Sequence, residues 1–343
     1  MGRVGQAFIA LVALWVALLA GGCDRPPQQL LVSGPTMGTT YSVKVASLPE
    51  GVDEDSVSAA IEEILGRVDR SMSGYRDDSE ISRFNAAAVT DWIPVSNDLA
   101  TVVDYALSVS RESGGAFDIT VAPLVAAWGF GAAGEPEVLP NEAELAELKT
   151  RTGYPLLQAR MEPPALRKEN AALIVDLNAI APGYAVDLLA ARLRAMRIDS
   201  FMIDIGGEVL ARGRNWRGET WRIAVERPVD AKPEAYAILQ LDNAAVTTSG
   251  EYRRYYDRDG RRYSHTIDPR TGRPVEHSLA SVVVVGPTSM HTDAWATAFN
   301  VLGTRAGHEL ATRLRMPVLF IDAQGQELRS IATAQFEPYV VQR

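Results

Sequence analysis

One pair of polar residues at helical spacing lies near the C-terminal end of the chain. Asp293 and Thr297 are four residues apart in a predicted helix over residues 288–302, so both oxygens project from one helix face. A carboxylate and a hydroxyl suit Mg²⁺, which takes few protein ligands and keeps waters or phosphates as the rest. The alternative is structural, with Asp293 as a helix N-terminal charge and Thr297 as a core-facing hydroxyl.

A histidine precedes this pair in the sequence. His265 lies in the segment 263–272, which enters an Asp-Pro-Arg-Thr-Gly turn. Directly before it, residues 251–262 carry five arginines and are predicted to form a hairpin that turns at 257–260. This positive charge in an otherwise acidic chain would suit phosphates.

A third candidate is the segment 176–187. A predicted buried strand at residues 173–177 leads into a helix that begins at Pro182, a residue favoured in the first helical turn. The start of a helix presents free N–H groups and the positive end of the helix dipole, which favour an anion. Asp176 falls at the end of the predicted strand, where polar ligand contacts are common. An ordinary strand-to-helix turn is the alternative.

Three further segments combine glycine with polar residues. Residues 72–85 contain Tyr75, which could offer an aromatic platform to a planar ligand, and the alternative is a capped loop entering a short helix. The tandem glycines at the start of residues 114–120 would let a ligand approach backbone N–H groups, or would simply end a helix. Residues 204–208 form a strand-to-glycine turn with a weaker signal.

Composition and pattern place these segments on a globular fold. Of the 343 residues, 47 % are apolar and 22 % charged, and the net charge of −9 disfavours general nucleic-acid binding. The sequence contains no G-x-G-x-x-G in a βαβ setting, no P-loop, no G-x-S-x-G and no Cys/His cluster at zinc spacing. Predicted helices and strands mix without strict alternation, which indicates an α+β domain. The predicted helices cover 57–68, 99–109, 140–149 and 288–302, and the strands cover 39–45, 201–205, 221–225, 237–241, 281–285 and 318–321.

The N-terminal region is typical of an exported protein. A short apolar run at residues 8–20 follows Arg3 and ends in small residues before Cys23, the only cysteine. This order is similar to the signal of bacterial lipoproteins, in which the cysteine is acylated, and an uncleaved membrane anchor is the alternative. We therefore predict a signal peptide at 1–22, a lipid-anchored tether at 23–30 and a catalytic domain at 31–343. Asp24 resembles an inner-membrane retention signal, which predicts attachment to the inner membrane facing the periplasm.

Taken together, these segments resemble the ApbE family of FAD:protein FMN transferases. The resemblance runs from about Gly34 to Gly303 and includes Met37-Gly38-Thr39-Thr40-Tyr41. It implies a largely antiparallel α+β fold related to the T-fold. It also implies a Mg²⁺-dependent transfer of FMN from FAD to a threonine or serine hydroxyl of an acceptor protein, with release of AMP. The implied acceptor is an exported or membrane-bound electron-transport subunit.

The resemblance also assigns roles to individual residues. His265 would be the catalytic base, and Mg²⁺ would be held by Asp293, Thr297 and the backbone carbonyl of Ala179. The residues expected to line the FAD site are Met37, Tyr75, Ala116, Phe117, Asp118, Asp176, Pro182 and Ile267. Two other functions use the same residues: a Mg²⁺-dependent FAD pyrophosphatase that gives FMN and AMP, and a non-catalytic FAD-binding lipoprotein. His265 and the pair Asp293 and Thr297 argue against storage alone, which needs neither a base nor a metal.

Overall fold

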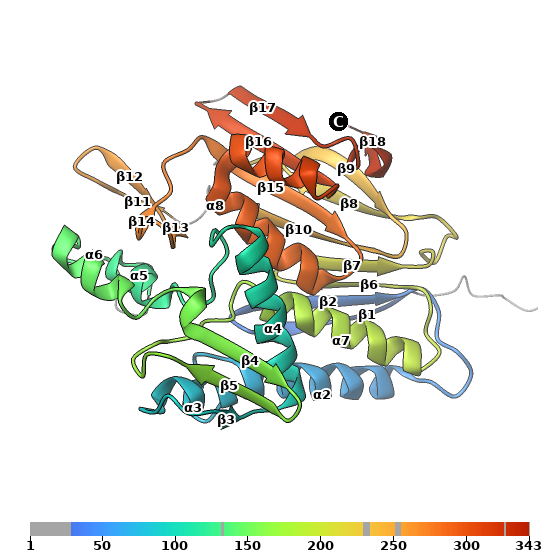
Figure 1. Cartoon of the computed structure of the whole chain (residues 1–343). Coiled ribbons are helices and arrows are strands. Elements are labelled where there is room, and N and C mark those ends of the chain that lie inside the picture. The colour runs from blue at the N-terminus through green and yellow to red at the C-terminus, as the bar shows by residue number, and fades with distance from the viewer. Residues whose placement is uncertain (1–28, 132–133, 229–233, 251–254, 326, 343) are drawn as a thin grey trace, which may run out of the picture.

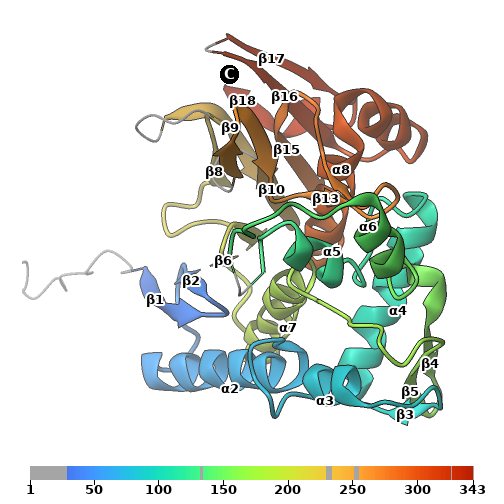
Figure 2. The same ribbon diagram turned by 90° about the vertical axis from the view of Figure 1, so that its left-hand side faces the viewer.

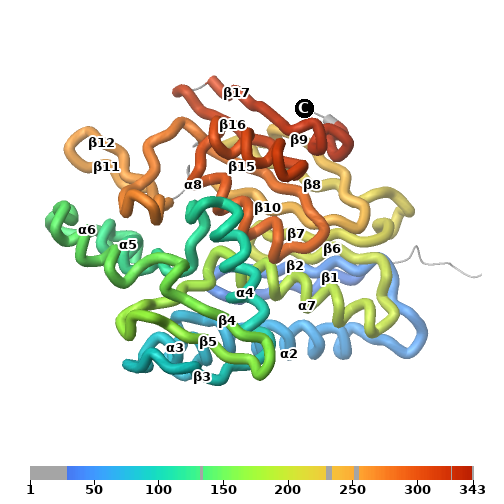
Figure 3. The backbone as a smooth tube through the Cα atoms, in the orientation of Figure 1, coloured from blue at the N-terminus to red at the C-terminus, as the bar shows by residue number. Residues whose placement is uncertain are grey.

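The computed structural model describes residues 29–131, 134–228, 234–250, 255–325 and 327–342. Its centre is an eight-stranded sheet in which every neighbouring pair is antiparallel. Figures 1 and 3 show this sheet running through the molecule, with helices against one face. In spatial order its strands are β1 (Leu30–Thr36), β2 (Thr39–Val45), β6 (Phe201–Ile205), β7 (Glu208–Arg212), β10 (Ala244–Gly250), β15 (Leu279–Gly286), β16 (Val318–Gln324) and β17 (Glu327–Ala332).

The central strand β15 explains why the sheet is covered on both faces. Successive side chains of a strand point to opposite faces, and in β15 both sets are valines. Val282 and Val284 join the core under the helices, whereas Val283 and Val285 join a second core on the other face. That second core is closed by a small sheet of β8 (Trp221–Glu226), β9 (Ala235–Leu241) and β18 (Val340–Gln342).

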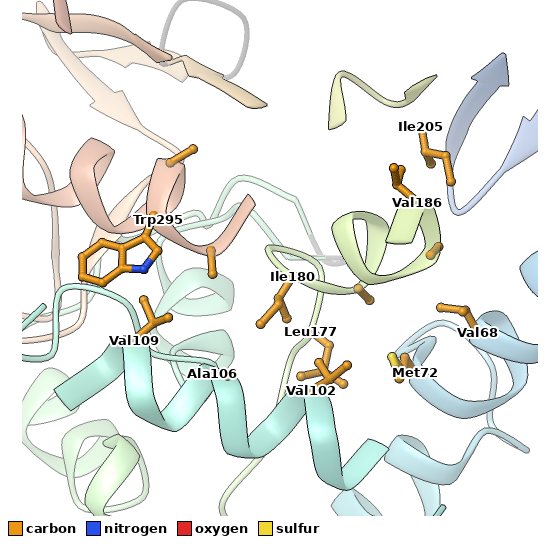
Figure 4. Close-up of a cluster of buried hydrophobic side chains, with 14 of the residues drawn as sticks. Val68, Met72, Val102, Ala106, Val109, Leu177, Ile180, Val186, Ile205 and Trp295 are labelled. Atoms are coloured by element: carbon orange, nitrogen blue, oxygen red, sulfur yellow. The ribbon is translucent and has the colours of Figure 1, made fainter. Parts of the chain in front are cut away.

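The helices form the other cover of the sheet. Helices α7 and α8 contact it directly, and α2 and α4 pack against α7 and α8 from outside. Buried side chains of α2, α4, α7, β6 and α8 meet in the cluster of Figure 4, which includes Met72, Val102, Val186, Ile205 and Trp295. The helices are α2 (Glu54–Met72), α3 (Glu80–Ala86), α4 (Asn97–Glu112), α5 (Ala122–Ala127), α6 (Glu142–Lys149), α7 (Ala181–Ala195) and α8 (Ser289–Arg313).

Most helix ends follow from their capping residues. Asp53 forms a capping box with Ser56 at the start of α2, and Ser79 and Ser96 cap α3 and α4 through their hydroxyls. Helix α8 is longer than the predicted helix over 288–302. It continues past a kink at Gly303, whose φ of 71° is open to glycine and closed to most other residues.

Two small assemblies flank the main body. One is the sheet of β3 (Ile93–Pro94), β5 (Pro164–Lys168) and β4 (Leu157–Met161), preceded by the 3₁₀ turn Tyr154–Leu156. The other, here called the arm, comprises α5, α6, β11 (Tyr255–Arg258), β12 (Arg261–Ser264), β13 (Ile267–Asp268) and β14 (Arg273–Pro274). Figures 1 and 2 show the arm gathered at one side of the molecule.

The predicted strand at residues 173–177 is wrong. Alternate side chains of this segment are buried, as they would be in a strand. At Val175, however, the backbone hydrogen-bonds to the side chain of Asn85 in place of a neighbouring strand. Asn85 Nδ2 donates to Val175 O over 2.9 Å, and Val175 N donates to Asn85 Oδ1 over 2.8 Å. Period-two hydrophobicity reports which side chains are buried and does not report strand pairing, which explains the error.

The N-terminal predictions fall outside the description. The signal peptide at 1–22, Cys23 and most of the tether at 23–30 lie among residues that the structure does not describe, while Leu30 already belongs to β1. No helix in the described ranges is both long and apolar enough to cross a bilayer.

Candidate active site where two helices meet

Helices α7 and α8 approach unusually closely at their N-terminal ends. The backbone N–H of Gly183 in α7 donates to Asp293 Oδ2 in α8 over 3.0 Å. A Cβ on Gly183 would lie 2.5 Å from Ser289 O and 2.9 Å from the Asp293 Cβ, far inside normal contact. Only glycine therefore allows Asp293 to reach the start of α7, and the Asp293 carboxylate is buried there.

The turn directly before α7 contains Ala179, four residues ahead of Gly183. Leu177 O accepts from Ile180 N over 3.1 Å and from Ala181 N over 2.8 Å, which makes a tight turn around residues 178–179. Leu177 and Ile180 are buried in the cluster of Figure 4, and Ala179 between them is half-buried. Two buried anchors thus fix the backbone of Ala179. Pro182 occupies the first turn of α7, as predicted from the sequence.

The electrostatics of Asp293 are those of a carboxylate removed from water. Burial, opposed by the hydrogen bond from Gly183 and assisted by the charge of Asp187, raises the pKa of Asp293 to about 7. Burial and the charge of Asp293 also raise the pKa of Glu208 well above its ordinary value. Two carboxylates that influence each other in a desolvated region are stabilised by a cation.

The donor set fits Mg²⁺ by its chemistry. Asp293 offers a carboxylate oxygen, Thr297 a hydroxyl one turn further along α8, and Ala179 a backbone carbonyl, all hard donors. Across the described ranges, no three His, Cys, Asp or Glu side chains gather in a way that could hold a metal ion. The expected set contains one carboxylate, and its other protein donors would be a backbone carbonyl and a hydroxyl.

His265 belongs to the arm, at the link between β12 and β13. The imidazole is half-buried, and its ring lies edge-on to Phe130 at a centroid distance of 6.3 Å. The next residue is tied to α8, because Asn300 Nδ2 donates to Thr266 Oγ1 over 3.4 Å. Asn300 lies three residues beyond Thr297, so the His265 segment is attached to the helix that carries Asp293 and Thr297.

The arginines of the β11–β12 hairpin are neutralised within the arm. Arg258 pairs with Glu135 over 3.0 Å, Arg262 with Asp257 over 3.3 Å, and Arg261 with Glu276. The predicted hairpin is confirmed, and its two turn residues, 259 and 260, both with positive φ, lie one position later than the centre of the predicted turn at 257–260. The basic segment therefore has internal partners for these three charges, while residues 251–254 lie outside the described ranges.

The structure joins two of the segments expected to contact FAD. Asp176 N donates to Ile119 O over 2.7 Å, so the segment of Asp118 lies against the segment of Asp176. Asp118 accepts from Thr120 N and Thr120 Oγ1 at one carboxylate oxygen and from Tyr154 N at the other. Burial raises the pKa of both Asp118 and Asp176, against the effect of these local hydrogen bonds.

The other expected FAD contacts differ in exposure. Ala116 and Phe117 are buried, whereas Tyr75 in the loop between α2 and α3 is 83 % exposed, so its ring is open for stacking. Met37 is half-buried in the β1–β2 turn with a φ of 47°. Ile267 is buried in the arm among aromatic side chains.

Sequence reasoning missed three residues at the helix contact. Gly183 and Asp187 lie within the segment 176–187, which was a candidate because of its predicted strand-to-helix turn and not because of these two residues. Glu208 ends the segment 204–208, which was only a weak candidate for ligand contact. A usable signal was present in α7: Gly183, Asp187 and Ala190 share one face at i, i+4 and i+7, which places a carboxylate on the buried side of the helix. Glu208 gave no comparable signal, because its neighbour Asp293 is distant in the chain.

Comparison with known proteins agrees with this architecture. The profile of the ApbE family matches residues 37–320. The chain belongs to the ApbE family. An FAD:protein FMN transferase of Vibrio cholerae is 39 % identical over 330 residues, which cover 96 % of this chain and 98 % of that protein. A protein of the same name from Salmonella typhimurium is 36 % identical over 346 residues, with 98 % of each chain covered.

Solved structures of ApbE proteins share the fold. The flavin transferase ApbE from Vibrio cholerae gives a TM-score of 0.85 at 39 % identity, covering 92 % of this chain and 100 % of that chain. The apo form of the flavinyl transferase ApbE from Pseudomonas stutzeri gives 0.83 at 38 % identity, with 91 % and 96 % covered. The α+β, largely antiparallel fold expected from the sequence is thereby confirmed.

Proposed function

We propose that this chain transfers FMN from FAD to a threonine or serine hydroxyl of an acceptor protein and releases AMP. The nearly full-length similarity to proteins named FAD:protein FMN transferase supports this activity. The observation that carries it in the structure is the contact of Asp293 with Gly183 at the start of α7, four residues after Ala179. The Asp293 carboxylate is desolvated there, which favours a cation that a diphosphate could share.

The reaction needs one bond made and one broken. The acceptor oxygen forms a bond to the phosphorus of the FMN half, the bond from that phosphorus to the AMP phosphate breaks, and AMP leaves. His265 takes the proton of the attacking hydroxyl, which is worth about 10²–10⁴-fold in rate. The N-terminus of α7 favours the charge of the diphosphate through its dipole.

Mg²⁺ belongs to this proposal through the fit of its donors. Asp293, Thr297 and the carbonyl of Ala179 would hold it. When bound, the ion supplies charge neutralisation for the departing phosphate, the main requirement of phosphoryl-type transfer. The protein's own part is to keep these oxygens fixed on α8 and on the turn before α7, and to keep water away from Asp293.

The flavin end would lie along the remaining expected contacts. Tyr75 offers an exposed ring that can stack on a planar group, at about 0.5–1.5 kcal/mol beyond the area buried. The other contacts would come from Met37, Ala116, Phe117, Asp118, Asp176, Pro182 and Ile267.

The cell envelope is the proposed location. The apolar run, the small residues and Cys23 support export and lipid attachment at the inner membrane, facing the periplasm. An acceptor in the same place would be an exported or membrane-bound electron-transport subunit.

A mass measurement on the acceptor tests the activity. The chain is incubated with FAD, Mg²⁺ and an acceptor domain that carries a flavinylation threonine, and the acceptor is then weighed by mass spectrometry. A gain equal to FMN less one water, with AMP in the supernatant, is expected. Free FMN and AMP with an unchanged acceptor would make the chain a pyrophosphatase, and intact FAD would make it a binding protein.

A further inference from the structure

The N-terminal ends of α7 and α8 are capped by each other. Asp293 of α8 accepts the N–H of Gly183 in α7, as described above. In return, Asp187 of α7 accepts the N–H of Ser289 over 2.7 Å and the N–H of Met290 over 2.9 Å, the first two residues of α8. Each helix therefore supplies a carboxylate to the free N–H groups of the other.

The hydrogen bond from Gly183 to Asp293 satisfies the one backbone N–H group in the first turn of α7 that would otherwise have no acceptor. Its N-cap residue, Ile180, provides no side-chain cap. Ala181 N donates to Leu177 O, Pro182 has no N–H, and Tyr184 N donates to Ile180 O. Gly183 N is the remaining donor of this turn, and Asp293 from α8 satisfies it.

At the start of α8, some of the backbone N–H groups donate to Thr288, the helix's own N-cap residue, and the others donate to Asp187 of α7. Thr288 Oγ1 accepts from His291 N, and Thr288 O accepts from Thr292 N. Asp187 accepts the N–H groups of Ser289 and Met290, which Thr288 leaves free, one at each carboxylate oxygen. Burial raises the pKa of Asp187 to about 6, consistent with a carboxylate enclosed between the two helices.

We propose that Asp187 is a positioning residue that fixes Asp293 and Thr297 relative to Ala179, and so sets the affinity of the site for a divalent cation. This inference rests on the proposed function for the cation itself. Ala179 lies just before α7, and Asp293 and Thr297 lie on the first turns of α8, so the three donors belong to separate elements. Asp187 ties those elements together at Ser289 and Met290, which lie about one helical turn before Asp293 and about two turns before Thr297, while Ala179 lies at the other end of the turn that leads into α7.

Glycine and aspartate act together in this arrangement. Gly183 removes the side chain that would hold the helices apart, and Asp187 supplies the attraction that closes the gap. Neither residue donates an oxygen to the proposed cation site. The expected consequence of removing Asp187 is therefore the one measured for outer-shell partners of metal ligands, about 10–100-fold in metal affinity.

Manganese binding tests the proposal without the reaction. Mn²⁺ replaces Mg²⁺, and its free concentration is followed by electron paramagnetic resonance during titration of the full chain. We expect one site in the wild type, a dissociation constant about 10–100-fold weaker in Asp187→Ala, and an intermediate value in Asp187→Asn, which keeps one acceptor oxygen. Asp187→Asn also carries the test if Asp187→Ala does not fold.

The matched control is Asp53→Ala. Asp53 caps α2 by accepting from Ser56 N, so its loss also removes an N-terminal cap and lowers the melting temperature, but far from the site. Wild-type Mn²⁺ affinity in Asp53→Ala and weakened affinity in both Asp187 variants support the proposal. Unchanged affinity in the Asp187 variants overturns it alone, whereas a wild type that binds no Mn²⁺ overturns the cation site of the proposed function as well.

Discussion

The contact of α7 with α8 and the arm around His265 are built in opposite ways. At the helix contact, buried carboxylates meet backbone N–H groups across a gap that only glycine permits. In the arm, aromatic rings stack and the exposed Arg261 and Arg262 pair with nearby carboxylates. The first arrangement fixes buried carboxylates against backbone N–H groups, whereas the second holds the half-buried imidazole of His265 against an aromatic ring.

This contrast separates binding from proton transfer. The cation and diphosphate would depend on elements that cannot move without breaking the core, since α7 and α8 both belong to it. His265 contacts Phe130, which packs against a separate cluster around Trp128, Tyr263 and Ile267. The bond from Asn300 to Thr266 links the segment of His265 to α8. The predictions below test how far a change in one region affects the other.

The largest effect is expected from His265→Asn. Loss of the base should lower FMN transfer about 10²–10⁴-fold, or about 3–5 kcal/mol in the activation barrier, while Mn²⁺ affinity stays at the wild-type value. Transfer is measured as flavin fluorescence on the acceptor in a denaturing gel. His308→Asn, on the far part of α8, is the control, and equal transfer by the two variants would refute the base assignment.

Next in size is the effect of Gly183→Ala on the helix contact. A Cβ placed 2.5 Å from Ser289 O must push α7 and α8 apart, at a cost of about 1–3 kcal/mol in the free energy of unfolding. Mn²⁺ affinity should fall with it. Urea denaturation gives the stability, and Gly74→Ala, which meets no atom within 4 Å and has an ordinary φ, is the control. Equal stability in both variants would mean that the close approach is not required.

The pH dependence of stability gives a graded effect. In the folded chain the pKa of Asp293 is raised to about 7, above the value in an unfolded chain near 4. Its contribution to the stability of the metal-free protein is thus fully present below about pH 4 and is lost as the pH rises through about 7. The melting temperature without metal should fall over that window, and Mg²⁺ should reverse the fall at pH 8.

The variant Glu208→Gln tests whether Glu208 also contributes to the pH dependence of stability. The pKa of Glu208 is also raised, by burial and by Asp293, so its removal should reduce the loss of stability with rising pH. A profile unchanged from the wild type would exclude Glu208 from the desolvated pair.

The smallest effect is expected at an exposed ion pair of the arm. Arg261→Ala removes the pair with Glu276, in which both side chains are more than half exposed. Such pairs contribute about 0–1 kcal/mol, and salt screens them. Unfolding in urea should therefore change little, and a loss well above 1 kcal/mol would show that the arm depends on Arg261, through Glu276 or through the Tyr263 ring that its guanidinium covers.

The sequence predicted local elements better than long-range contacts. The strand at 201–205, the helix that begins near Pro182 and the turn at 257–260 each follow from residues close together in the chain. The strand at 173–177 failed because its partner is the side chain of Asn85, ninety positions away. The roles of Asp187 and Gly183 were out of reach for the same reason, since their partners lie more than 100 positions later.

The residues of the candidate site also divide into those that the sequence could predict and those that depend on long-range contacts. Asp293 and Thr297 could be paired by their helical spacing, and the resemblance supplied Ala179 and His265. The raised pKa of Asp293 could not be foreseen, because it depends on burial between two helices and on neighbours from other elements. The spacing of residues in the sequence identifies which oxygens share a helix face. Only the folded structure shows which of those oxygens are buried away from water.

Anomalous diffraction from crystals that contain FAD and Mn²⁺ tests the central claim most directly. We predict an anomalous peak at coordination distance, about 2–2.3 Å, from oxygens of Asp293, Thr297 and Ala179, with the diphosphate bound to the same ion. A peak and a diphosphate in another part of the molecule, with Asp293 and the start of α7 free of both, would contradict the account.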